Sequence, residues 1–130
     1  MATYDNLPVY KISYDLLLNI FIFSQDMKRE YKYTVGENLK KETVSLIANI
    51  YRANCSLNKT NLIQAARENT EVIRLYLRLI KDLKQISLAK FIKINEIIEL
   101  VSKQLSFWQK AIINQGQNRH LVTAMASAPN

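Results

Sequence analysis

Residues 91–112 read FIKINEIIELVSKQLSFWQKAI, and this stretch decides the fold class. Its apolar residues recur at alternating intervals of three and four, which is the period of one face of an α-helix. The residues with this spacing are Phe91, Ile94, Ile98, Val101, Leu105, Trp108 and Ile112. A seam of this length is typical of helices that pack in an antiparallel bundle. It predicts a helix that begins after a capping Ser87 and reaches about Asn114.

Similar periodicity extends back through most of the chain, and few residues interrupt it. The 130 residues include two prolines, Pro8 and Pro129, near the two ends, and two isolated glycines. All-β and α/β folds need turn residues at shorter intervals than this. The sequence therefore predicts an all-α fold, an up-down-up-down four-helix bundle with short connections. The three earlier helices are expected over residues 9–30, 35–55 and 58–85.

Local signals set two of the expected boundaries. Residues 34–37, Thr-Val-Gly-Glu, have the spacing of a capping box, in which the Thr34 hydroxyl accepts from a first-turn N–H and Glu37 reaches back to the N–H of Thr34. After Asn114 no sustained apolar period remains. We therefore expect a bundle domain over residues 1–114 and a disordered tail over residues 115–130.

The first helix is apolar on every side between residues 16 and 23. A helix of this kind is covered on all sides, which an outer helix of a lone four-helix bundle is not. Either the tail or another subunit has to cover it, and the polar tail is a poor cover, so self-association is favoured. The residues expected at the oligomer interface are Leu16, Leu17, Leu18, Ile20 and Phe21.

The helix over residues 58–85 is expected to carry a core arc and a basic stripe. The core arc comprises Leu62, Ala65, Ala66, Asn69, Val72, Ile73, Tyr76, Leu79, Ile80 and Leu83. At 100° per residue, the stripe falls within about 60° on the opposite side of the helix. Its members are Arg67, Arg74, Arg78 and Lys81.

This basic stripe has two interpretations. A charged helix face is often a solvated face, and Glu71 can pair with Arg67 or Arg74 at helical spacing. However, the stripe has more arginine than lysine, and the planar guanidinium of arginine can bind phosphate through two hydrogen bonds. Side chains of like charge on one face also repel one another unless an anion binds there. Because the chain has a net charge of +7, we take the stripe as a candidate surface for nucleic acid or a partner. Three basic residues of the preceding helix are added to it, Lys40, Lys41 and Arg52.

The same composition argues against several classes of function. Cys55 and His120 are the one cysteine and the one histidine, too few for a zinc site or an internal disulfide. Two isolated glycines cannot make a phosphate-binding loop. We therefore expect no catalytic residues, no metal and no cofactor. The longest dense apolar stretch is shorter than the roughly 20 residues of a membrane span, so we expect a soluble, cytoplasmic protein without a membrane partner.

Several segments together resemble a known family. The entrance over residues 7–18, LPVYKISYDLLL, resembles the four-helix-bundle proteins that include products of intervening sequences in 23S ribosomal RNA genes. Three further segments are similar to the accessory variability determinant (Avd) branch of that family: REYKYTVGE at 29–37, IYRAN at 50–54 and IRLYLR at 73–78. The late segment QLSFWQK at 104–110 fits the last helix of the family, although Phe107 precedes the tryptophan where a small residue is common.

The resemblance covers about residues 7–114 and carries its own expectations. Avd proteins accompany the reverse transcriptase of diversity-generating retroelements. The resemblance implies a homopentameric barrel, and a non-catalytic accessory role in mutagenic retrohoming. It implies binding of the reverse transcriptase and of DNA or RNA with weak sequence specificity, and places the arginines of the family's third helix at Arg74 and Arg78. The alternative is an intervening-sequence type of interaction protein, RNA- or ribosome-associated, without a reverse transcriptase partner.

Overall fold

The computed structural model describes the backbone of residues 7–127 and the side chains of residues 7–116. In this part of the chain every regular element is an α-helix. The helices are α1 (Pro8–Ser24), α2 (Arg29–Lys32), α3 (Val35–Cys55), α4 (Lys59–Asp82) and α5 (Leu88–Ser127). The expected all-α class is therefore confirmed for these residues, with four long helices and one short helical turn.

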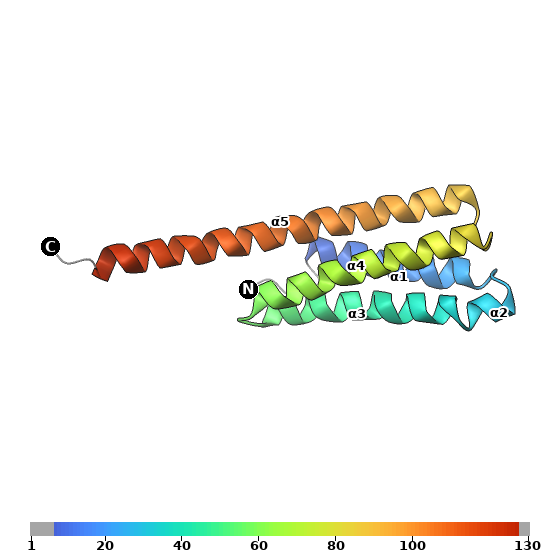
Figure 1. The fold of residues 1–130 in the computed structure, drawn as a ribbon, viewed down its shortest axis with the longest axis horizontal. Coiled ribbons are helices and arrows are strands. Elements are labelled where there is room, and N and C mark those ends of the chain that lie inside the picture. Colours follow the sequence, from blue (N-terminus) through green and yellow to red (C-terminus); the bar gives the residue numbers. More distant parts are fainter. Residues whose placement is uncertain (1–6, 128–130) are drawn as a thin grey trace.

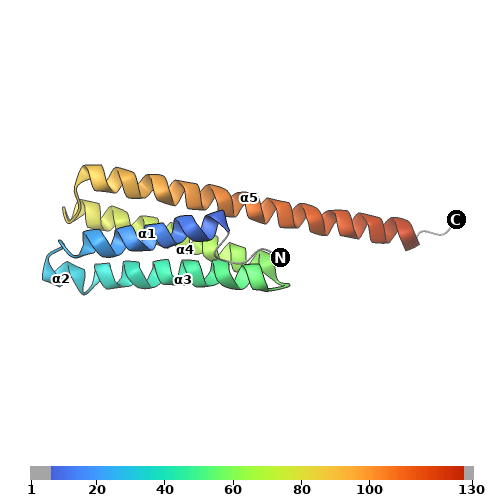
Figure 2. The same ribbon diagram turned by 180° about the vertical axis from the view of Figure 1, so that it is seen from behind.

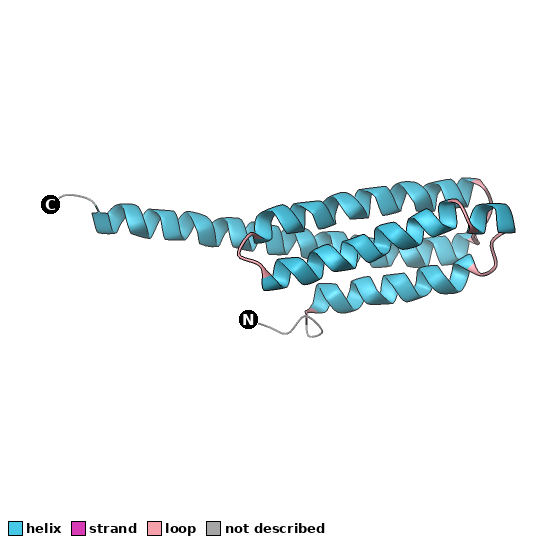
Figure 3. Ribbon diagram, turned by 90° about the horizontal axis from the view of Figure 1, so that it is seen from below, coloured by secondary structure: helices cyan, strands magenta, loops and turns pink. Residues whose placement is uncertain are grey.

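The four long helices run alternately up and down, as the ribbon shows (Figure 1). α1 packs against α3 and α5, and α4 packs against the same two helices. The view from behind and the view from below show the same arrangement (Figures 2 and 3). Sequence neighbours are thus also neighbours in space, as short connections require.

The core is a column of aliphatic side chains along the axis of the bundle. The seam expected in residues 91–112 provides Ile94, Ile98, Val101 and Leu105, which are buried, and its other members are packed at the edge of the same core. Burying a side chain of this size stabilises a fold by about 1.5–3 kcal/mol. The largest fully buried side chains are Leu16, Ile20, Leu39, Leu46, Ile50, Ile63, Ile73, Leu77, Ile80, Ile98, Val101 and Leu105.

The first helix ends earlier than expected. α1 ends at Ser24, and the chain turns through residues 25–28 into α2 instead of continuing to Glu30. Met27 is buried at this corner and anchors it. The next helix comes close here, because a Cβ on Gly36 would lie 3.3 Å from the carbonyl oxygen of Tyr31 and 3.7 Å from the Met27 side chain. A short turn with one buried methionine therefore replaces the last part of the expected helix.

The expected capping box does not form. Thr34 is the N-cap residue of α3, but its hydroxyl donates a hydrogen bond to the carbonyl oxygen of Glu30 at 2.6 Å. Glu37 instead pairs with Lys40 at 3.4 Å. The reason is that α2 ends directly before α3, so the carbonyls of its last turn are the nearest partners for the threonine. Ser87, in contrast, caps α5 as expected, since its hydroxyl accepts from the N–H of Lys90 at 3.2 Å.

The buried face of α4 is rotated by about a quarter turn from the expected arc. Its buried residues are Ile63, Ala66, Thr70, Ile73, Leu77 and Ile80. Leu62, Val72 and Tyr76 are half-buried at its edge, and Leu79 is exposed. Asn69 is also at this edge, where its amide donates to Glu42 and accepts from Asn49 of α3. The apolar residues of α4 form a wide arc, and the packing of α3 and α5 selects which part is central.

The C-terminal boundary also differs from the expected one. Helical backbone continues past Asn114 to Ser127, where a disordered tail from Gln115 was expected. Residues 128–130 of that tail lie outside the described residues. One glycine is the sole strong helix breaker between Asn114 and Ser127, and leucine, alanine and methionine favour helix. This end of α5 projects beyond the other helices (Figure 1), in line with its lack of a periodic apolar face.

Candidate functional site

The basic stripe lies beside the buried face of α4, toward α5, and not opposite the core as expected. Arg67 is half-buried there, and its guanidinium donates a hydrogen bond to the side-chain oxygen of Gln109 on α5. The amide of Gln109 in turn donates to Gln64 on α4 at 3.0 Å. Arg67 is therefore a structural link between α4 and α5, which limits its access to a ligand.

Arg74 is neutralised within the chain. One nitrogen of its guanidinium pairs with Glu71 on α4, and the other pairs with Glu99 on α5 at 2.6 Å. Its side chain is 28% exposed, whereas both carboxylates are mostly exposed. A polyanion would have to compete with two carboxylates for this guanidinium, so Arg74 is a weak phosphate site.

Arg78 and Lys81 are more available. The Arg78 side chain is 81% exposed and lies 4.0 Å from a carboxylate oxygen of Asp82, a distance at which pairing in water is weak. Lys81 lies with its ammonium 4.9 Å from the centroid of the Phe91 ring on α5. These two residues form the end of the stripe that is nearest to α2.

The three basic residues expected on the preceding helix lie elsewhere. The Lys40 ammonium is 4.6 Å from the centroid of the Phe21 ring on α1, and Lys41 lines the same shallow pocket. Arg52 lines a groove between α1 and α3 further along. The structure therefore separates the seven candidate residues into a group on α4, toward α5, and a group on α3, toward α1. Their role in binding stays a prediction.

The expected oligomer interface divides into buried and exposed residues. Leu16 and Ile20 are fully buried in the core of their own chain, so their assignment to an interface is corrected. Leu17 is half-buried, and Leu18 and Phe21 are each 45% exposed. The helical period places Leu16 and Ile20 on the side of α1 opposite Leu18.

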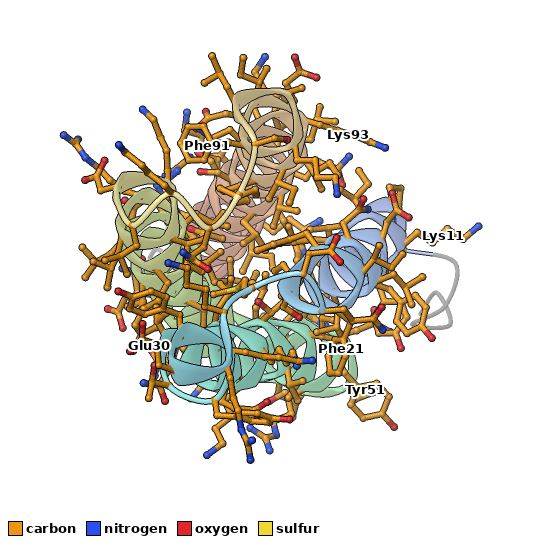
Figure 4. The ribbon with its side chains drawn as sticks, turned by 90° about the vertical axis from the view of Figure 1, so that its right-hand side faces the viewer. Lys11, Phe21, Glu30, Tyr51, Phe91 and Lys93 are labelled. Carbon is orange, nitrogen blue, oxygen red and sulfur yellow. The ribbon has the colours of Figure 1, made fainter. Side chains whose placement is uncertain are left out.

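Exposed and half-buried apolar side chains of α1 and α3 gather on one side of the bundle. We call this the α1–α3 face, and it comprises Tyr14, Leu17, Phe21, Val44, Ile47 and Tyr51, together with Leu18, which the helical period places next to Tyr14 and Phe21 on the outer side of α1. Figure 4, which looks along the bundle, shows Phe21 and Tyr51 on the side where α1 and α3 meet. A groove of about 590 Å³ lies between the two helices on this face. Soluble monomers rarely leave a large contiguous apolar patch uncovered.

A second concentration of charge, which the sequence pattern did not predict, lies at the α2 end of the bundle. The segments 25–34 and 78–93 meet there, because both connect helices at the same end (Figure 1). Together they contain eight basic and three acidic residues, a net charge of +5 out of +7 for the whole chain. Pairing the first connection with the third, as an up-down bundle requires, would have revealed this concentration.

Two negative findings apply to the part of the chain that the structure describes. No three or more histidine, cysteine, aspartate or glutamate side chains of residues 7–116 come together as a metal site would need. No described helix has both the length and the apolar character needed to cross a bilayer.

Comparison with known families identifies the chain. A family model described as bAvd-like matches residues 8–112, from the first residue of α1 to the part of α5 that packs in the bundle. The chain belongs to the bAvd-like family. This confirms the resemblance to the Avd branch of four-helix-bundle proteins, and bAvd-like proteins are generally accessory proteins and not enzymes. No curated protein matches the bAvd-like chain.

Proposed function

We propose that this bAvd-like chain is the non-catalytic accessory protein of a diversity-generating retroelement. In this role it binds the retroelement reverse transcriptase and nucleic acid, and it supports mutagenic retrohoming. The observation that carries the proposal is the family match, which spans the complete four-helix bundle. The net charge of +7 supports it, because a basic protein of this size attracts polyanions at long range.

The proposal includes a closed homo-oligomer, preferably the pentamer that the resemblance implies. The uncovered α1–α3 face supports self-association, because its exposed residues come from two adjacent helices and include three aromatic side chains. A ring with an odd number of subunits needs two different surfaces on each chain. The outer side of α5 provides a second apolar surface, with Ile92, Leu100 and Phe107 exposed.

The direct test is co-purification with a reverse transcriptase encoded beside this chain. The tagged chain should retain the untagged enzyme through washes at 0.5 M salt, because interfaces with apolar anchors persist when long-range charge is screened. A variant with Leu18→Asp and Tyr51→Asp, both exposed, should lose the enzyme if the assembled form is needed. Failure of the wild-type chain to retain the enzyme would contradict the proposal. A gene located within 23S ribosomal RNA would favour the intervening-sequence alternative.

A further inference from the structure

The α2 end of the bundle is built from two connections that are tied together. The backbone N–H of Lys28 donates a hydrogen bond to the side-chain oxygen of Gln85 at 2.8 Å, across 57 residues of sequence. The amide of Gln85 donates to the carbonyl of Leu83 at 3.0 Å, which holds the side chain in place. Lys90 and Asp26 approach within 3.9 Å across the same gap. The two connections that carry the basic side chains are therefore held together at this end.

Most of the positive charge at this end has no carboxylate partner among the described residues. Among the described residues, the ion pairs at this end are Lys90 with Asp26 and Arg78 with Asp82, at 3.9 and 4.0 Å. The other six basic residues of the two segments have no carboxylate oxygen of residues 7–116 within 4.0 Å; they are Lys28, Arg29, Lys32, Lys81, Lys84 and Lys93. Five of these six are exposed, and Figure 4 shows Lys93 pointing outward at this end. This contrasts with Arg74, whose two carboxylate partners already neutralise it.

One of these lysines has an unfavourable backbone conformation. Lys84 follows the C-cap residue of α4 with φ = 59°, in the left-handed region where glycine is the usual residue. The N–H of Gln85 reaches the carbonyl of Ile80 at 3.0 Å, which is the hydrogen bond that closes such a helix end. The chain therefore has a lysine in a backbone geometry that suits glycine. A side-chain role for Lys84 would account for this choice.

An aromatic side chain completes the surface. Tyr33 is 60% exposed, and the ammonium of Lys32 lies 5.9 Å from its ring centroid. An exposed aromatic ring beside basic groups is the combination that single-stranded nucleic acid uses, with phosphates on the cations and a base on the ring. Protein interfaces instead use clustered apolar anchors, and in this chain these lie on the α1–α3 face and on the outer side of α5.

We infer that the α2 end contacts the phosphate backbone of single-stranded nucleic acid, with Tyr33 as a stacking position for one base. The inference rests on the nucleic-acid part of the proposed function and gives it a location. Lysines dominate the surface, and lysine contacts phosphate as a point charge without the planar fork of arginine. The expected binding is therefore dependent on salt and weakly dependent on sequence.

The test compares two triple variants with the same change in charge. Arg29→Gln, Lys84→Gln and Lys93→Gln remove three exposed cations from the α2 end. Lys11→Gln, Lys103→Gln and Lys110→Gln remove three exposed cations from the rest of the bundle, so both variants lose three positive charges. Binding to labelled 20-nucleotide RNA, DNA of the same sequence and the DNA duplex is measured by fluorescence anisotropy at several salt concentrations. Circular dichroism checks that helix content is unchanged.

The α2-end variant should bind single strands at least tenfold more weakly than the wild type. The slope of log affinity against log salt should fall by about 2, because each lost phosphate contact on a single strand removes about 0.7. The affinity of the control variant for single strands should stay within threefold of the wild-type affinity. Tyr33→Ser should weaken binding of single strands about fivefold, the lower end of what one stacked base contributes, and leave duplex binding within twofold. Lys93→Gln alone should lower the slope by about 0.7, which keeps the test valid if the triple variant is poorly folded.

Three results would overturn the inference, and they are separable from a failure of the proposed function. Equal losses in the two triple variants would mean that affinity follows net charge and not location. An unchanged α2-end variant would exclude this surface while leaving nucleic-acid binding intact. A wild type that binds polyglutamate but neither RNA nor DNA would exclude nucleic acid as the ligand, and co-purification with the reverse transcriptase would still test the accessory role.

Discussion

At the scale of single residues, Lys84 allows function and stability to be separated. A non-glycine residue in the left-handed region is destabilised by about 1–2 kcal/mol, and the greater chain entropy of glycine in the unfolded state offsets part of this. Lys84→Gly should therefore raise the free energy of unfolding by about 0.5–1 kcal/mol. Urea denaturation followed by circular dichroism measures this change. A loss of stability would show that the Lys84 side chain supports the turn.

The same substitution has a second readout, since it removes one cation from the α2 end. We expect Lys84→Gly to be more stable than the wild type and to bind single strands more weakly. Lys84→Gln is the matched control, because it removes the charge and keeps the strained backbone. Only Lys84→Gly should change the free energy of unfolding, whereas both variants should bind single strands more weakly than the wild type.

At the scale of helices, one side of α1 packs in the core and the other side is exposed. Leu16 is fully buried and Leu18 is 45% exposed, two residues apart on the same helix. Leu16→Ala should lower the free energy of unfolding by about 2–5 kcal/mol, because it leaves a cavity. Leu18→Ala should change the stability of the subunit by no more than about 0.5 kcal/mol. Denaturation of dilute protein compares the pair, and equal losses would mean that both sides of α1 are packed within one chain.

Helix periodicity alone predicted the buried side of some helices but not of others. The apolar residues at intervals of three and four in residues 91–112 form the longest regular seam of α5, and this seam faces the core, although Ile92, Leu100 and Phe107 are apolar on the outer side. α4 has apolar residues over a wide arc, and the contacts of α3 and α5 select the buried part, which the sequence of α4 alone does not contain. The concentration of basic residues at the α2 end was not predicted for a related reason. Its basic residues are about 50 positions apart in sequence, and topology alone brings them together.

At the scale of the whole molecule, the α1–α3 face predicts that one chain is not the stable unit. We expect light scattering at micromolar concentration to give a mass close to five times the 15.1 kDa of one chain. Leu18→Asp with Tyr51→Asp should shift the mass toward that of a monomer, because charges in an apolar interface are costly to bury. A wild-type mass near 15.1 kDa would contradict self-association, and a dimer or tetramer would contradict the pentamer alone.

α5 makes the two ends of the molecule independently accessible to an experimenter. It has 40 residues, so its last turn lies about 60 Å from its first at 1.5 Å per residue. Its first turn belongs to the α2 end, and its last part projects from the opposite end of the bundle (Figure 1). A fluorophore or sensor-surface attachment near Ser127 therefore lies far from Lys93 and Tyr33, whereas the same group attached near Ser87 would obstruct them. Immobilising the protein through its C-terminal end should leave the α2 end open to added nucleic acid.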